Sequence, residues 1–474
     1  MKQIYDKRFG YTLALVLAAF MALGFLPGGF DFSQSPPGSE EVDESAVVEG
    51  SILRRVQYMP LLLLSFYVAW RRRTVALQFL KDVNPMVLAF TAFAALSLLW
   101  SPEPGISLRR LVLVLGNLGA AFAFQLACWY PSRFARVSCW IFAGLMLAAL
   151  FAVLFIPSVG LTTYAPHAGS WRGITSHKNQ AGMLAAIGFI FWSHAYFAGH
   201  YRKWVCLAFA GLALLLIVMA RSSTSLLAAL ICLVVIWWAV KPVLAVANWM
   251  LVTIMTGIAL VGGLVFVFFV TTGKLPTMQT VVGPIAQAFG KDPSLTGRDV
   301  IWADIWSYYI QNPWLGRGFE SFWLGATGPS GELGEAYYWR PNQSHNGYLD
   351  ILNETGAVGL TLLVLFLLVY LWRMLQFYRL DARQASLHLA IFMFVFIHNW
   401  TESSLFRASH PAFLLLLFSS FTVDRALSPV MQRLDYRQRY SAWLKRRQSR
   451  RQSTGPDTLT ASASAGRSIS RHAR

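Results

Sequence analysis

Long apolar segments alternate with short polar ones along most of this chain. A helix that crosses a membrane needs about 20 mostly apolar residues, and about twelve segments approach that requirement. They lie near residues 11–27, 56–70, 85–100, 108–129, 138–157, 180–198, 203–220, 225–240, 243–270, 356–372, 386–400 and 411–422. No small-residue cleavage site follows the first segment, so we expect it to be retained rather than removed as a signal peptide. The pattern predicts an all-α integral membrane protein of about 12 transmembrane helices.

The composition agrees with this pattern. Of 474 residues, 56% are hydrophobic and only 13% are charged, whereas soluble domains carry about 25% charged residues. We therefore expect one polytopic membrane domain over residues 1–423, followed by a basic cytoplasmic tail over 424–474. Beyond about residue 450 the tail is rich in Ser, Ala and Arg, a composition typical of disorder.

The distribution of positive charge predicts the orientation. If the amino terminus is cytoplasmic, the inner loops receive clusters such as Arg71-Arg72-Arg73, and the tail receives Lys445-Arg446-Arg447. The first outer loop, residues 28–49, contains no Lys or Arg. This alternation obeys the positive-inside rule with both termini in the cytoplasm. The net charge of +18 is then explained by contact with anionic membrane lipid, and no nucleic-acid partner is expected.

The longest polar segment, residues 271–355, falls on the outer face between the ninth and tenth predicted spans. Thr296 and Asp299 have the spacing of a capping box, and the helix after them should end before Pro313. Its apolar positions recur at helical spacing: Ile301, Trp302, Ile305 and Trp306. We expect this helix to lie in the membrane interface, with its tryptophans at headgroup depth. A second helix is expected from near His345 to Gly356.

Several cations lie on the outer side, where the positive-inside rule disfavours them. They are Arg54, Arg55, Arg109, Arg110, Arg172, Lys178, Arg221, Lys274, Lys291, Arg298, Arg317, Arg340 and Arg407. Any one of them can be a headgroup anchor whose charged end reaches the interface. As a set they suit an anionic ligand better, because the planar fork of arginine matches two phosphate oxygens. Arg298 also falls in the first turn of a predicted helix, where backbone N–H groups favour anions.

His345 lies in the same outer loop, beside the predicted start of the second helix. It can be an ordinary surface histidine, or a base kept neutral by the helix dipole and the nearby arginines. A neutral imidazole beside fixed cations suits the activation of a sugar hydroxyl for attack on a phosphate-activated carbon. The sequence contains no HExxH, GxSxG or Walker motif, and the outer loop contains no DxD pair. We therefore expect chemistry that uses neither a metal ion nor an organic cofactor.

Six short segments resemble the signatures of the bacterial O-antigen ligase and polysaccharide polymerase family. They are Trp171-Arg172-Gly173-Ile174-Thr175-Ser176-His177-Lys178-Asn179, Ala220-Arg221-Ser222-Ser223-Thr224, Thr296-Gly297-Arg298, Ser344-His345-Asn346, Leu99-Trp100-Ser101-Pro102 and Thr401-Glu402-Ser403. The resemblance implies a metal-independent, inverting glycosyltransferase of the bacterial inner membrane, with an undecaprenyl-diphosphate-linked glycan as donor. It implies that Arg172 and Arg298 bind the donor diphosphate, that His345 is the catalytic base and that Glu402 is an acidic residue of the pocket. We place Lys178 and Arg221 with the substrate-binding cations.

Two questions remain open from the sequence. The acceptor is either another lipid-linked repeat unit, as in a polymerase, or lipid A-core, as in a ligase. The His-Lys-Asn form of the first segment resembles the branch called exopolysaccharide production proteins and favours a polymerase. A lipid-linked-glycan transporter would also have about twelve spans. It would carry charged residues in mid-span, and the predicted spans are nearly free of charge between their ends.

Overall fold

The computed structural model describes residues 24–27, 32, 52–127, 131–164, 167–240, 298–324, 328–336, 341–407 and 410–435. In this part of the chain the regular structure is helical, apart from one isolated antiparallel bridge between Leu161 and Trp171. The all-helical expectation is therefore confirmed for the described ranges. The predicted tail beyond residue 450, the acidic outer loop and Thr296 lie outside them.

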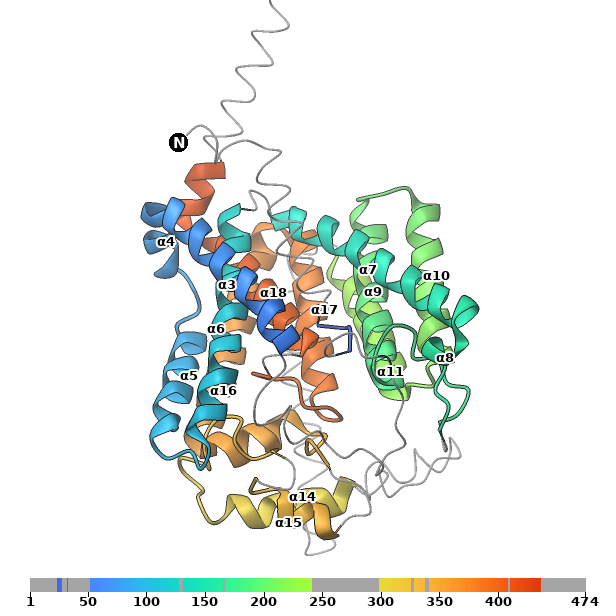
Figure 1. Ribbon diagram of the computed structural model, residues 1–474. Coiled ribbons are helices and arrows are strands. Elements are labelled where there is room, and N and C mark those ends of the chain that lie inside the picture. Colours follow the sequence, from blue (N-terminus) through green and yellow to red (C-terminus); the bar gives the residue numbers. More distant parts are fainter. Residues whose placement is uncertain are drawn as a thin grey trace, which may run out of the picture.

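The helices form one bundle with α17 and α18 at its centre (Figure 1). The central pair are α17 (Ala382–His398) and α18 (Pro411–Leu427). On one side lie α7 (Pro131–Phe155), α9 (Lys178–Ala198), α10 (Lys203–Met219) and α11 (Ser223–Ala239), and on the other lie α3 (Ile52–Arg71), α5 (Pro85–Leu96), α6 (Pro104–Ala127) and α16 (Gly347–Leu380). The short elements are α4 (Arg73–Leu80), η3 (Ser97–Leu99), α8 (Pro157–Gly160), α14 (Arg298–Tyr309) and α15 (Gly331–Ala336).

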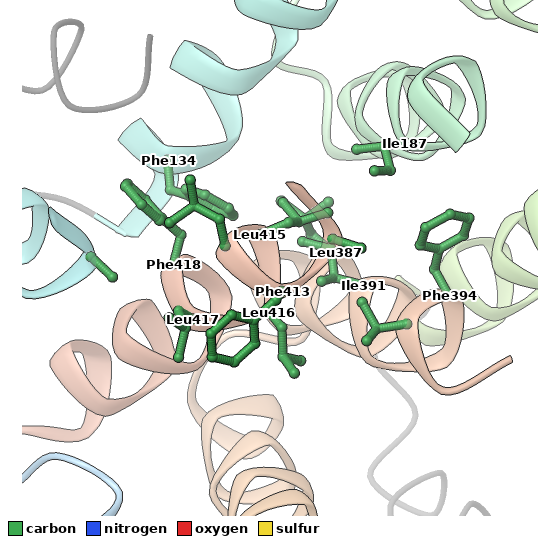
Figure 2. Close-up of a cluster of buried hydrophobic side chains, with 14 of the residues drawn as sticks. Phe134, Ile187, Leu387, Ile391, Phe394, Phe413, Leu415, Leu416, Leu417 and Phe418 are labelled. Atoms are coloured by element: carbon green, nitrogen blue, oxygen red, sulfur yellow. The ribbon is translucent and has the colours of Figure 1, made fainter. Parts of the chain in front are cut away.

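Apolar side chains fill the centre of the bundle. Figure 2 shows residues of α7, α9, α17 and α18 meeting there, including Phe134, Ile187, Leu387 and Phe418. Every residue of α18 from Pro411 to Arg425 is buried. A helix that is apolar around its whole circumference is typical of such a central position. The shortest predicted span is therefore the most enclosed helix among those described.

Four described helices are long and apolar enough to cross a membrane, or up to six if each of two bent helix pairs is one span. The four are the stretches Pro104–Ala127, Ser132–Phe155, Lys178–Ala198 and Gly347–Leu380. Shorter apolar helices include Lys203–Met219, Ser223–Ala239 and Ala382–His398. Large apolar side chains also cover the outside of the bundle, such as Leu63, Leu154 and Leu215, as expected where helices face lipid. The total of about twelve spans stays a prediction, because the segments near 11–27 and 243–270 lie almost wholly outside the described ranges.

A sharp bend divides α16. Gly356 has φ 65° and ψ −170°, so residues 347–355 form a short helix that precedes the long span. A side chain at Gly356 would meet the Trp314 carbonyl oxygen at 2.2 Å, which only glycine avoids. The expected second helix up to Gly356 is thus confirmed. Together with α14 and α15, this short helix closes one end of the bundle, opposite the end that carries α4 (Figure 1).

Candidate active site

The carboxylate of Glu402 lies where four segments meet at the closed end of the bundle. Asn179 Nδ2 donates to its Oε1 at 2.9 Å, and Gln343 Nε2 donates to its Oε2 at 3.1 Å. His345 Nδ1 lies 3.3 Å from Oε2, and Arg298 Nη2 lies 3.8 Å from a carboxylate oxygen. Glu402 lies in the loop after α17, and these contacts come from the start of α9, the start of α14 and the loop before α16. Three of the six signature segments thus meet a fourth at one carboxylate.

These groups are within reach of a ligand. The side chains of Arg298 and His345 keep 18% and 22% of their surface exposed, and that of Glu402 keeps 14%. Burial by itself would raise the pKa of Glu402, but its hydrogen bond with His345 and its electrostatic interactions with His345, His398 and the Arg298 guanidinium hold the pKa below the usual carboxyl range. Glu402 is therefore an anion at neutral pH.

His345 adopts an uncommon backbone conformation. Its φ of 55° lies in the left-handed region, which non-glycine residues occupy at a cost of about 1–3 kcal/mol. Such strain persists only where the surroundings fix the backbone. Here Trp302 Nε1 donates to the Ser344 carbonyl at 2.8 Å, and the Gly347 N–H donates to the Asn399 carbonyl at 2.9 Å. The loop is thus held on both sides of the histidine, which directs the ring at Glu402.

The helix that follows His345 is fixed by its own cap and by buried charges. The Asn346 side chain accepts from the N–H groups of Tyr348 and Leu349, as an N-cap does. Asp350 accepts from the Ser344 N–H at 3.3 Å and from Trp323 Nε1 at 3.0 Å. Arg407 Nη2 lies 3.2 Å from Asp350 and 2.9 Å from Glu354. Arg407, one of the outer cations, therefore bridges two buried carboxyl groups and holds the helix behind the site.

Arg298 is the first residue of α14, which extends to Tyr309 and stops before Pro313. Burial lowers the pKa of its guanidinium and Glu402 opposes that effect, yet arginine stays charged at any physiological pH. A cation at the positive end of a helix dipole is suited to an anionic ligand. The predicted position of Arg298 is confirmed. The Trp302 indole bonds to the Ser344 carbonyl, and the headgroup depth expected for the tryptophans of α14 stays a prediction.

Arg172 occupies a different environment. It is 2% exposed, and its guanidinium donates to the carbonyls of Val159 at 2.8 Å, Ser176 at 3.4 Å and Phe32 at 2.5 Å. These bonds hold the loop that leads into α9. The Arg172 guanidinium thus bonds to backbone carbonyls in this structure. A direct contact between Arg172 and a donor diphosphate stays a prediction.

Lys178 and Arg221 lie on neighbouring segments. Lys178 is the first residue of α9, and Arg221 is an exposed residue of the turn between α10 and α11. The Trp171 N–H donates to the Met219 carbonyl at 3.1 Å, which joins the loop before α9 to that turn. Their role in substrate binding stays a prediction.

Two residues at Glu402 were not singled out from the sequence, Asn179 and Gln343. Asn179 is the last residue of a quoted signature, and Gln343 directly precedes another. Neutral amides give no signal of chemistry in a sequence. Only their contact with a shared carboxylate identifies them.

The structural ranges described contain no group of three or more His, Cys, Asp or Glu side chains that could hold a metal ion. Cys139, Cys206 and Cys232 are buried and are not joined in disulfides. A metal-free reaction stays an expectation from the sequence.

Two comparisons with known proteins bear on this site. A family model described as O-antigen ligase matches residues 208–364, a range that includes Arg221, Arg298 and His345. The exopolysaccharide production protein ExoQ of Rhizobium meliloti (strain 1021) is 26% identical over 346 residues, which are 70% of this chain and 75% of that protein. The matched range contains two of the four signatures that meet at Glu402, those of Arg298 and His345. The two comparisons support the resemblance of this chain to an O-antigen ligase-like family.

Proposed function

We propose that this protein is a metal-independent, inverting glycosyltransferase of the bacterial inner membrane. The donor would be a glycan linked to undecaprenyl diphosphate, bound where the closed end of the bundle meets the outer face of the membrane. The observation that carries the proposal is the contact of Glu402 with both His345 and Arg298. Through Glu402, the proposed general base, His345, lies close to Arg298, a cation suited to a diphosphate.

The chemistry follows from the two ring nitrogens of His345. If the Nδ1–H group donates a hydrogen bond to Glu402, the other ring nitrogen, Nε2, carries the lone pair and can accept a proton. An acceptor hydroxyl gives its proton to Nε2 as its oxygen bonds to the anomeric carbon of the donor. The bond from that carbon to the diphosphate oxygen breaks on the opposite face, and the diphosphate leaves with the electron pair. Configuration at the carbon is therefore inverted.

Cations stabilise the charge that develops on the leaving group. Arg298 is placed for this, because it neighbours the base and keeps part of its side chain exposed. Lys178 and Arg221 are proposed to contact the donor from the start of α9 and from the turn between α10 and α11. These cations would balance, together with Arg298, the negative charge of the two phosphates.

For the acceptor, we favour a second lipid-linked repeat unit, so that the protein polymerises an exopolysaccharide or O-antigen. The support is the likeness to a protein named for exopolysaccharide production. The alternative is transfer to lipid A-core, supported by the description of the matching family as O-antigen ligase. Product length distinguishes the two reactions.

The test supplies purified protein with an undecaprenyl-diphosphate-linked repeat unit, with and without lipid A-core, and resolves the products by length. A ladder of longer lipid-linked chains without lipid A-core identifies a polymerase. A single transfer that requires lipid A-core identifies a ligase. Donor binding without either product favours a transporter and overturns the proposal. Activity that is lost in EDTA and restored by magnesium contradicts the metal-free mechanism.

A further inference from the structure

Glu402 contacts the side chains of two neutral amides as well as His345 and Arg298. Asn179 donates to one carboxylate oxygen, Oε1, and Gln343 donates to the other, Oε2. Gln343 Oε1 also accepts from the Ser403 N–H at 3.0 Å. Gln343 is therefore bonded to both the side chain of Glu402 and the backbone that follows it, which fixes the direction of the carboxylate from two points.

Asn179 and Arg298 contact the same carboxylate oxygen, but at different distances. Asn179 Nδ2 lies 2.9 Å from Oε1, which is a good hydrogen bond. Arg298 Nη2 lies 3.8 Å from Oε1, beyond hydrogen-bond distance. Oε1 keeps a hydrogen bond from the Asn179 amide whether or not Arg298 stays close. The carboxylate can thus keep its place at His345 while the guanidinium turns to another anion.

We propose that Asn179 and Gln343 are positioning residues, which hold Glu402 against His345 and so leave Arg298 available to the donor diphosphate. The inference rests on the proposed function and assigns a separate task to each contact of Glu402. The amides and Glu402 orient the base, and Arg298 binds the donor. A charged residue in place of either amide would not serve, because a second cation would compete for the carboxylate and an anion would repel it.

The test measures kcat, the KM for donor and donor affinity for Asn179→Leu and Gln343→Leu. A misplaced base lowers turnover by roughly 10²-fold, so kcat should fall by that order with donor affinity unchanged. Arg298→Gln should differ by weakening donor affinity, in addition to any loss of turnover from a less stabilised leaving group. Gln311→Leu is the matched control, since the Gln311 amide bonds to Arg317 and to the Ser307 carbonyl instead of Glu402. Donor affinity that falls in the amide variants as it does in Arg298→Gln would overturn the inference.

A double-mutant cycle separates positioning from a general structural role. If the amides act through Glu402, then in a Glu402→Ala background Asn179→Leu and Gln343→Leu should cost no further activity. Losses that multiply in that background would mean that the amides act independently of Glu402.

A readout without turnover keeps the inference testable if the wild-type protein forms no product. In ¹⁵N-histidine NMR, the His345 signal, assigned from its loss in His345→Gln, should show the Nδ1–H tautomer. The combined Asn179→Leu and Gln343→Leu variant should lose that preference. An unchanged tautomer would contradict the positioning role, whereas absent product with the expected tautomer change would contradict only the proposed function.

Discussion

His345 Nδ1 lies 3.3 Å from Glu402 Oε2, although 57 residues separate the two in the chain. The first residue precedes α16 and the second follows α17. These two helices form an antiparallel pair, so the loop before one and the loop after the other meet at the same end of the bundle. A carboxylate bonded to one ring nitrogen fixes the tautomer of the histidine and leaves the other nitrogen as the proton acceptor. The following predictions test this arrangement.

Replacing His345 by alanine removes the proposed base but leaves Arg298. We expect turnover to fall roughly 10²–10⁴-fold, the usual range for positioned acid–base help. Expression and donor affinity should change little. The measurement is product formation by purified protein together with donor binding. Full turnover in His345→Ala would show that the histidine is an ordinary loop residue.

Arg298→Lys keeps the positive charge and loses the planar fork. Loss of one charge-assisted hydrogen bond costs about 1.5–3 kcal/mol, so donor affinity should weaken roughly 10- to 100-fold. Arg317→Lys is the matched control, because Arg317 bonds to Gln311 and lies over the Tyr308 ring. Equal tolerance of both changes in a complementation assay would mean that Arg298 is only a headgroup anchor.

His177 predicts a dependence of stability on pH. Burial lowers its pKa from the ordinary 6.5 to about 4, although Glu402 opposes this. Between those values the unfolded chain binds a proton that the folded protein does not, so the free energy of unfolding falls as the pH is lowered through this window. His177 Nδ1 accepts from the Asn179 N–H as an N-cap, and asparagine can do the same.

The variant His177→Asn should therefore keep the cap and lose the titration. Apparent melting temperatures in detergent, measured from pH 7 to pH 4, should fall less steeply for the variant than for the wild-type protein. Parallel curves of melting temperature against pH would show that His177 is protonated equally in the folded and the unfolded protein.

Gly347→Ala should disrupt the loop of His345. A Cβ at this position would lie 2.2 Å from Asn399 Oδ1. That oxygen accepts from the N–H groups of Ser404 and Leu405, so it is not free to move away. We expect a destabilisation of about 1–3 kcal/mol, as in other overpacked sites, and reduced activity. Gly211→Ala on α10 is the control, because nothing lies within 4 Å of its Cβ position. Similar melting temperatures and activities for the two variants would contradict the close approach at Gly347.

The proposed orientation is tested by alkaline phosphatase fusions. A fusion after Lys291 should be active, because the long polar loop is expected on the outer face, and one after Arg383 should be inactive. The opposite pattern would place Glu402 and His345 in the cytoplasm and remove the reason for grouping the outer cations.

The sequence by itself determined the class of the protein, since apolar length and the distribution of charge depend on composition along the chain. It also located the helix start at Arg298, because its turn signals are local. The end of the second helix at Gly356 was also predicted from the sequence, and the bend itself was seen only in the structure. Motifs in the sequence singled out His345, Arg298 and Glu402, but they did not predict which side chains these residues contact.

Partners across long separations depend on how helices pack, and packing decided which side chains meet at the site. The bundle brought Asn179 and Gln343 to Glu402, and neither amide was assigned a role from the sequence. It buried Arg172 against backbone carbonyls, although by sequence Arg172 and Arg298 were equivalent cations at a membrane boundary. It also joined the Trp302 indole to the Ser344 carbonyl. The direction of a side chain depends on the neighbours that fill the space around it, and those neighbours come from distant parts of the chain.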